Sequence, residues 1–293
     1  MEVLQTLING TLTGAVYGVV ALSFVVIYRA SKIVNLAQGQ VIMVSAFFVW
    51  FFVQKMEFPL WAGLPLSLVA SVCMGAVIER LVFRRLIGQP VFSVVMASIG
   101  LLILLQGAVQ LVFGAQTRPF PQVLPDGAWK IGDILLNKSL LIGALLTFLL
   151  TELLNLFFTH TSAGLRLAAV AEDHVTAMSL GISVRNATAI AWMMGVTLSL
   201  IAAIILLSGK VLGLQAAEIG LRALPVALLG GLESVRGASL AGILIGIGEA
   251  LASRYIDPHT AGAASMVFPY LLMVFLLLFR PQGFFGWKRI ERL

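Results

Sequence analysis

The sequence predicts an all-α, polytopic integral membrane protein, and three observations support this fold class. Of the 293 residues, 60% are hydrophobic and only 11% are charged, whereas an average soluble domain carries about a quarter charged residues. The apolar residues are gathered into runs that are separated by short polar connections. Several of these runs reach the roughly 20 residues that an α-helix needs to cross a hydrocarbon core of about 30 Å.

The apolar runs set the number of expected helices. They cover, in chain order, residues 7–28, 41–53, 60–83, 93–113, 136–158, 187–208, 223–232, 237–253 and 266–279. We expect about eight transmembrane helices plus broken or re-entrant segments, within a single transmembrane domain that spans residues 1–293. The first run is too long for the core of a signal peptide and no basic residue precedes it, so we expect it to remain as a span.

The polar stretch "VNLAQGQ", residues 34–40, interrupts the apolar sequence between the first two runs. The second run, residues 41–53, would be only about 20 Å long as a helix, too short to cross alone. The polar stretch must then lie within the depth of the membrane, where irregular backbone is tolerated only if it is buried in protein or faces a water-filled cavity. We therefore predict that Asn35, Gln38, Gly39 and Gln40 line a solute pathway. Gly39, which adds no bulk, should let a neighbouring backbone or the solute approach closely.

The positive-inside rule sets the expected orientation. If the turn at Arg29 and Lys32 is cytoplasmic and the segments alternate, twelve of the 19 Lys and Arg residues fall inside. This orientation places the N-terminus outside and makes residues 280–293 a cytoplasmic tail. The successive segments can alternate between the two sides of the membrane and still leave the tail inside only if residues 223–253 enter the membrane and return as two short arms. Pro225, Gly230 and Gly231 weaken the first arm, so we expect a second broken helix there.

Two connections are long enough to carry structure of their own. Residues 114–135 contain three prolines and are expected to form an ordered external loop. Residues 159–186 are expected to form a folded cytoplasmic segment. In this segment Thr161 or Ser162 can cap a short helix, Asp173 can cap a second helix, and Gly181 is placed to end it.

The cytoplasmic segment has two interpretations. One is an amphipathic connector on the membrane surface, which would carry several basic residues on its polar face. The other is a docking element for a protein partner. Leu165, Ala169 and Glu172 follow one another at i, i+4 and i+7, which places them on one stripe of a short helix. Because an acidic end follows this stripe, we favour a protein partner over anionic lipid.

Two sets of glycines recur at intervals of four residues within apolar runs. They are Gly10, Gly14 and Gly18 in the first run, and Gly242 and Gly246 in a later one. Small residues at this spacing let helix backbones approach closely in a membrane. We expect them to serve helix packing.

No catalytic or metal-binding set is evident in the sequence. The three histidines, His160, His174 and His259, lie in connections without metal-ligand spacing. No nucleophile with a partnered base stands out, and the chain has no G-x-x-x-x-G-K-[ST] phosphate loop. We therefore expect no enzyme activity, and any ATP must be bound by another subunit. The basic residues are scattered among the connections, which argues against a nucleic-acid partner.

Three carboxylates lie within or at the ends of apolar runs, where a charge is costly and often functional. Each can be a structural pair or part of an ion relay in a secondary transporter or channel, and we favour structural pairs. The expected neighbours are Arg80 for Glu79, Asn155 for Glu152, and Arg254 and Asp257 for Glu249.

Four motifs resemble one known family. They are "LINGTLTGAVYGVVALSFVVIYRASKIVNLAQGQVIMVSAFF" at residues 7–48, "TSAGLRLAAVAEDHVTAMSLGI" at 161–182, "GGLESVRGASLAGILIGIGEA" at 230–250 and "FRPQGFFG" at 279–286. In this order they are similar to the smaller membrane permease subunit of bacterial branched-chain amino-acid ABC importers, which are type II importer-like. The chain departs from the usual family pattern at Gln40, where the family often has glutamate, and near Ala168, where it often has an arginine.

The resemblance implies a permease subunit that forms the path for branched-chain amino acids or a related small polar solute. Its implied partners are a second homologous permease, two cytoplasmic ATPase subunits that bind ATP and Mg, a periplasmic substrate-binding protein and the lipid of the bacterial inner membrane. It implies no cofactor on this chain. The residues implied to couple to the ATPase are Leu165, Arg166, Ala169, Glu172, Asp173 and Gly181. The alternative, an ion-coupled secondary transporter or channel, would depend on Glu152 or Glu249.

Overall fold

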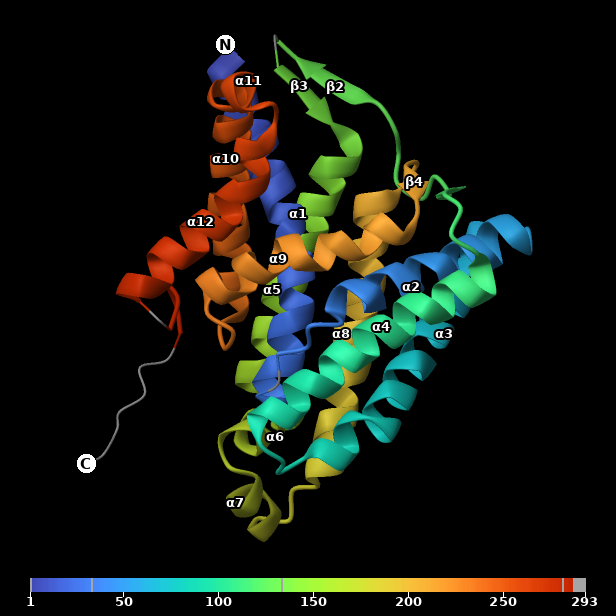
Figure 1. Cartoon of the computed structure of the whole chain (residues 1–293), viewed down its shortest axis with the longest axis vertical. Coiled ribbons are helices and arrows are strands. Elements are labelled where there is room, and N and C mark those ends of the chain that lie inside the picture. Colours follow the sequence, from blue (N-terminus) through green and yellow to red (C-terminus); the bar gives the residue numbers. More distant parts are fainter. Residues whose placement is uncertain (1, 33, 133, 281, 287–293) are drawn as a thin grey trace. The chain divides into compact units, whose positions relative to one another are not determined.

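The computed structural model describes residues 2–32, 34–132, 134–280 and 282–286. These residues form α-helices and two small two-stranded sheets (Figure 1). The chain divides into two compact units. Unit 1 comprises the described parts of Met1–Val25, Gly127–Asn155 and Arg222–Leu293, and unit 2 comprises those of Val26–Asp126 and Leu156–Leu221. The expected tail falls partly outside the described residues, because it includes 281 and 287–293.

Within the described residues, six helical segments are long and apolar enough to cross a membrane. They are α1 (Glu2–Ser31), α3 (Leu60–Leu81) with the 3₁₀ turn η2 (Phe83–Leu86), α4 (Val91–Phe113), α5 (Lys138–His160), α8 (Val184–Leu207) and α10 (Val235–Tyr255). Shorter helices add to them, and they include α2 (Gln38–Trp50), α9 (Glu218–Gly230) and α12 (Ala263–Phe279). The predicted all-α, polytopic membrane fold is confirmed, with short helices accounting for the segments that are not full spans.

Residues 223–253 were expected to form two short arms, and the structure differs from this expectation in the second arm. The first arm is the short α9, which runs through Pro225 without a break. The second arm is α10, a helix of 21 residues. It is longer than the apolar run because Ser234 caps its start by accepting a hydrogen bond from the Gly237 amide (3.0 Å), and because its last turn continues through the polar residue Arg254. Only the first arm is therefore a short segment, and neither arm is interrupted within its helix.

The connection at residues 114–135 and the residues just after it form strands that the sequence did not predict. In unit 1, β2 (Ala128–Ile131) pairs with β3 (Ile134–Asn137) in an antiparallel hairpin. Gly132 lies in the hairpin turn with φ +62°, a conformation that glycine adopts at little cost. In unit 2, β1 (Arg118–Pro119) pairs with β4 (Val211–Leu212). Residues 118–119 and 128–131 of this connection thus take part in short strand pairings.

Unit 1 contains a close crossing of α1 and α10 at the repeated glycines. A Cβ added to Gly14 would fall on the carbonyl oxygen of Gly242, and one added to Gly246 would fall on the backbone of Gly10 and Gly14. The close packing predicted from the glycine spacing is confirmed. On the other side of the helix pair, α12 packs against α10 (Figure 1).

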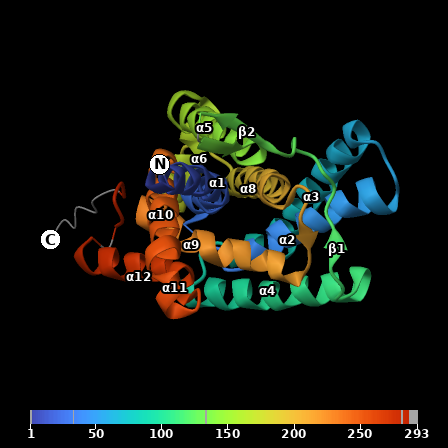
Figure 2. The same ribbon diagram turned by 90° about the horizontal axis from the view of Figure 1, so that it is seen from above.

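Unit 2 is built around α2. This helix contacts α8, α3, α4 and the 3₁₀ turn η3 (Leu214–Ala217), and Figure 2 shows it between α8 and α4. All of its residues from Gln38 to Phe47 are buried. A π-helical turn, η1 (Phe51–Lys55), extends it. The short second run thus becomes a helix surrounded by protein, so its polar first turn lies inside the unit.

The partner of Glu79 differs from the one expected. Its carboxylate, 1% exposed, accepts two hydrogen bonds from the Arg84 guanidinium (2.7 and 3.1 Å) and one from the Thr188 hydroxyl (3.2 Å). Arg84 lies five positions after Glu79, in the 3₁₀ turn η2 that follows α3. The adjacent Arg80 is exposed, since neighbouring residues on a helix point in different directions.

We expect Arg84→Ala to destabilise the subunit strongly, because it leaves the buried Glu79 carboxylate without its counter-charge. Arg80→Ala removes the same charge from an exposed position and is the matched control. Thermal unfolding in detergent, followed by size-exclusion chromatography, should show a midpoint lowered by roughly 5 °C or more only for Arg84→Ala. Equal midpoints for the two variants would contradict this assignment.

Candidate functional site

The break between α1 and α2 is held by a chain of buried amides. The Asn35 side-chain oxygen accepts a hydrogen bond from the Ala37 amide (3.1 Å), and the Asn35 amide group donates to Gln38 Oε1 (2.8 Å). Gln38 Nε2 then donates to Ser199 Oγ on α8 (2.7 Å). Gln38 is 0% exposed, and Gln40 is also buried. The structure therefore gathers the predicted polar residues at one helix break and links Asn35 and Gln38 to Ser199 within unit 2.

Gly39 is the point at which the start of α2 contacts η3 and the start of α9. A Cβ added to Gly39 would fall on the carbonyl oxygen of Ala217, the last residue of η3, and would lie 3.4 Å from the Cα of Gly220 in α9. A Cβ on Gly220 would in turn fall on the backbone of Gly39. The expectation that a neighbouring backbone approaches Gly39 is confirmed. Only glycine fits on either side of this contact, so the start of α2 has no room to shift independently.

The segment expected to be folded contains two short helices, α6 (Ser162–Glu172) and α7 (His174–Ser179). Thr161, and not Ser162, caps α6 by accepting a hydrogen bond from the Gly164 amide (3.0 Å). Asp173 caps α7 by accepting from the Val175 and Thr176 amides (2.7 and 3.0 Å). Gly181 ends α7 with φ +77°. Figure 1 shows both helices beside the start of α8.

One face of α6 is buried within unit 2 and another face is open. The buried face consists of Gly164, Leu167, Val170 and Ala171. On the open side, Leu165 is 55% exposed and Ala169 is partly exposed. The stripe predicted for a partner is thus accessible in this chain.

Exposed apolar residues on and after α7 extend this accessible surface, and the sequence reading missed them. Val175 is 72% exposed, Met178 is 57% exposed and Leu180 is 73% exposed. Such side chains are costly to leave in water and mark interaction surfaces when they gather. The signal in the sequence was their occurrence in a connection that otherwise reads as polar.

The charged residues of this segment make contacts within the chain. Asp173 is occupied as the cap of α7, and Glu172 accepts a hydrogen bond from Lys32 Nζ, 3.2 Å away. Arg166 is exposed and lines a cavity of about 420 Å³ together with Ser183 and Asn186 at the start of α8. Glu172 and Asp173 therefore have structural roles that the sequence spacing did not reveal.

Glu152 and Glu249, the two deeper carboxylates, lie beside cations or a hydroxyl in unit 1. Glu152 accepts two hydrogen bonds from Arg236 (3.1 and 2.6 Å), and not from Asn155 as expected. Glu249 lies beside the Tyr17 hydroxyl and the Arg222 guanidinium. Both partners come from distant parts of the chain, so local spacing could not identify them.

The neighbours expected for Glu249 are engaged elsewhere. Arg254 forms an ion pair with Glu2. Asp257 accepts hydrogen bonds from the hydroxyl and the amide of Ser265 (2.7 and 2.9 Å), which hold the pKa of its carboxyl below the usual value. The predicted grouping of Glu249 with these two residues is therefore wrong.

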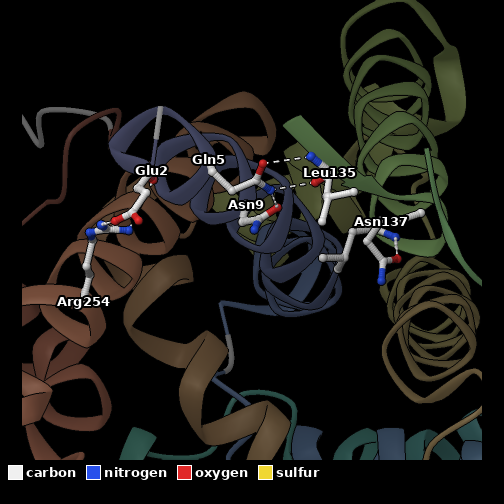
Figure 3. A pocket seen from close by; sticks show the side chains of 8 residues that line it. Glu2, Gln5, Asn9, Leu135, Asn137 and Arg254 are labelled. Atoms are coloured by element: carbon white, nitrogen blue, oxygen red, sulfur yellow. Dashed lines mark hydrogen bonds and ion pairs between the residues drawn. The ribbon is translucent and has the colours of Figure 1, made fainter. Parts of the chain in front are cut away.

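A second cavity, of about 620 Å³, lies at the end of unit 1 formed by the start of α1, the β2–β3 hairpin and the end of α10 (Figure 3). Gln5 spans it by accepting from the Leu135 amide (2.9 Å) and donating to the Leu135 carbonyl (2.6 Å) and to Asn9 (3.3 Å). These bonds fasten the hairpin to α1. The cavity thus marks a junction of elements whose polar groups bind one another.

Among the residues that the structure describes, no group of three or more His, Cys, Asp or Glu side chains is placed to hold a metal ion. The site is instead a set of amide, hydroxyl and glycine residues at helix breaks. Such groups can exchange hydrogen bonds with a polar solute.

Comparison with known proteins identifies the family. Residues 6–277 match the family described as "Branched-chain amino acid transport system / permease component". The chain is 28% identical to the high-affinity branched-chain amino acid transport system permease protein BraD of Pseudomonas aeruginosa, over 99% of this chain and 97% of that protein. It is 26% identical to the corresponding protein LivH of Escherichia coli, with the same coverage.

A solved structure shares the fold. PsaBC from Streptococcus pneumoniae, in complex with a Fab, aligns with a TM-score of 0.50 over 94% of this chain and 91% of that chain, at 14% identity. This likeness concerns the fold alone. Because the family match extends over nearly the whole sequence, the chain belongs to the family of permease components of branched-chain amino acid transport systems.

Proposed function

We propose that this chain forms the translocation path for branched-chain amino acids, or a related small polar solute, as a permease subunit of an ATP-driven importer. The observation that carries the proposal is the family match over residues 6–277. The polar helix break buried among α8, η3 and α9 agrees with it, because discontinuous helices commonly form solute sites in membrane transporters. In this proposal residues 1–293 act as one transmembrane permease domain.

In this proposal Asn35, Gln38, Gly39 and Gln40 line the solute path when the break opens. Their uncharged amides can exchange hydrogen bonds with a polar solute without holding it tightly. In the structure the Gln38 amide bonds to Ser199, so a solute amide or carboxylate would replace one hydrogen bond with another. A weak site of this kind suits a permease, since tight binding would slow release.

The proposed energy source lies on partner subunits. Two cytoplasmic ATPases would bind ATP and Mg, this chain would pair with a second homologous permease, and a periplasmic binding protein would deliver the solute. The open stripe of α6 and the exposed apolar residues of α7 support a docking surface for the ATPase. In this arrangement Leu165, Arg166 and Ala169 would make contact with it, whereas Glu172, Asp173 and Gly181 would shape the segment.

The proposed location is the bacterial inner membrane, with the N-terminus outside and the C-terminus in the cytoplasm. Under this orientation the loop at 114–135 is external, and the segment at 159–186 and the tail at 280–293 are cytoplasmic. The excess of Lys and Arg on the cytoplasmic side supports it. We propose no enzyme activity for the chain itself.

Uptake of a labelled solute panel tests the substrate class. Cells expressing the permeases, the ATPases and the binding protein would be compared with cells that lack only this chain. Leucine, isoleucine and valine should accumulate only in the complete set. If urea or short amides accumulate while these amino acids do not, the proposed substrate is wrong, although the role as a permease stands.

The alternative, ion-coupled transport, requires a carboxylate that binds and releases an ion. Glu152 is held by two hydrogen bonds to Arg236, and Glu249 faces the Arg222 guanidinium. Structural pairing therefore accounts for both groups, and the family match supports ATP as the driver.

We expect the Glu249→Gln variant to retain ATP-dependent uptake when an ionophore collapses the proton gradient. Glutamine keeps the shape and the hydrogen-bonding capacity beside Tyr17 but cannot carry a proton. Initial rates in cells with maintained ATP should stay within about threefold of the unmodified subunit, as for the loss of one modest polar contact. Uptake that follows the proton gradient in the unmodified subunit and is lost in the variant would favour the alternative.

A further inference from the structure

The last turn of α1 ends in an unusual elbow. Lys32, the residue after the helix, has φ +53°, a left-handed conformation that a side chain makes unfavourable. Its amide still donates to the Tyr28 carbonyl (2.7 Å), so the backbone leaves helical geometry at Lys32 itself. Three residues later Asn35 begins the amide chain to Gln38 and Ser199. Lys32 thus occupies the point at which α1 leads into the broken segment.

The same elbow is tied to the segment that contains α6. Lys32 Nζ lies 3.2 Å from Glu172 Oε1, at the last residue of α6. One turn earlier on α1, the Arg29 guanidinium lies 4.5 Å from the ring centre of Phe158, which is buried near the end of α5. Two cations on the end of α1 therefore contact the helices that precede and form the proposed docking segment.

The ion pair is poorly explained as a stabilising contact. The Lys32 side chain is 28% exposed and that of Glu172 is 72% exposed, and ion pairs open to water contribute little to stability. The strained backbone of Lys32 adds a cost of its own. An exposed pair can, however, break and reform easily, which suits a contact between parts that move.

Movement at the elbow cannot be absorbed inside the break. Gln38 is fully buried and bonded to Ser199, and Gly39 rests against the Ala217 carbonyl. Close-packed groups of this kind transmit displacement instead of damping it. A shift of the α6 end would therefore reach the residues proposed to line the path through only a few contacts.

We propose that the Lys32–Glu172 pair transmits movement of the α6–α7 segment to the α1–α2 break, which makes Lys32 a positioning residue for transport. The inference rests on the proposed function, since it takes the ATPase as the source of that movement. It assigns Glu172 to a contact within this chain and not to the ATPase surface.

Charge reversal tests the proposal in the complete complex reconstituted in proteoliposomes, where both solute uptake and ATP hydrolysis are measured. Lys32→Glu and Glu172→Lys should each retain the ATPases and hydrolyse ATP, but should lower solute imported per ATP hydrolysed at least threefold. The double variant should recover most of that ratio, because it restores the attraction with the charges exchanged. Lys32 Nζ also lies 5.7 Å from the ring centre of Tyr28, and Lys55 Nζ lies in the same way 5.5 Å from that of Phe51. Lys55→Glu is therefore the matched control and should leave the ratio unchanged.

The ratio of solute imported to ATP hydrolysed decides whether the Lys32–Glu172 pair transmits movement. Unchanged ratios in both single variants, or a double variant no better than the singles, would overturn the proposal. If a reversed variant fails to assemble, Lys32→Gln and Glu172→Gln remove the attraction without repulsion and should still lower the ratio. If the unmodified complex shows no ATP-dependent uptake at all, the proposed function fails and not this inference alone.

Discussion

Gly39→Leu should abolish solute uptake and greatly reduce the amount of folded subunit. The Cβ alone would fall on the Ala217 carbonyl oxygen, and the rest of the side chain would force α2 away from η3 and α9. Neither backbone can yield without breaking the amide chain that begins at Asn35. Overpacking a close helix contact in this way is strongly destabilising. Uptake assays and size-exclusion chromatography of the detergent-solubilised subunit measure both effects.

Two further variants test whether the loss is due to the close contact at Gly39. Gly39→Ala adds only the Cβ and should give a smaller loss in the same direction. Gly107→Leu places the same side chain on α4, where an added Cβ meets no atom within 4 Å, and should behave like the unmodified subunit. Normal uptake by Gly39→Leu would remove the α2–η3 contact from the transport path.

Ala169→Asp should leave membrane insertion intact but prevent the subunit from retaining its ATPase. The position is partly exposed in this chain, on the open side of α6. An unpaired carboxylate buried at a protein interface costs about 2–5 kcal/mol, enough to weaken association by more than tenfold. Co-purification of the ATPase and substrate-stimulated ATP hydrolysis should both be lost.

The control for this variant is Ala163→Asp, in the first turn of the same helix. That residue is exposed and lines the cavity toward α8, and an acidic residue near a helix start is favourable. It should retain the ATPase. If Ala169→Asp also retains both the ATPase and the stimulated hydrolysis, α6 serves only as a connector.

The helix break at residues 34–40 could be predicted because polar residues inside apolar runs have few physical explanations. The amides at 34–40 could be placed only at a helix break, and the caps Thr161 and Asp173 follow from the local preferences of helix starts. Gly181 ended a helix for a similarly local reason. These features depend on residues a few positions apart, which a sequence shows directly.

Contacts between distant residues were not accessible in the same way. Glu79 pairs with Arg84, which lies in the 3₁₀ turn after α3, and not with the adjacent Arg80. Glu152 finds Arg236, which is 84 positions away. Ser199 and Ala217 complete the helix break from segments that carry no polar signal of their own. The sequence therefore predicted which residues gather at breaks but not which partners complete them.

The proposed function is tested most directly by measuring which energy source drives transport by the unmodified chain. The purified complex with its partner permease and ATPases would be placed in proteoliposomes, with binding protein and labelled leucine on the outer side. If transport is driven by ATP, uptake of labelled leucine should require enclosed ATP and the binding protein. It should persist when ionophores collapse all ion gradients. Uptake that proceeds without ATP and follows an imposed proton or sodium gradient would contradict it.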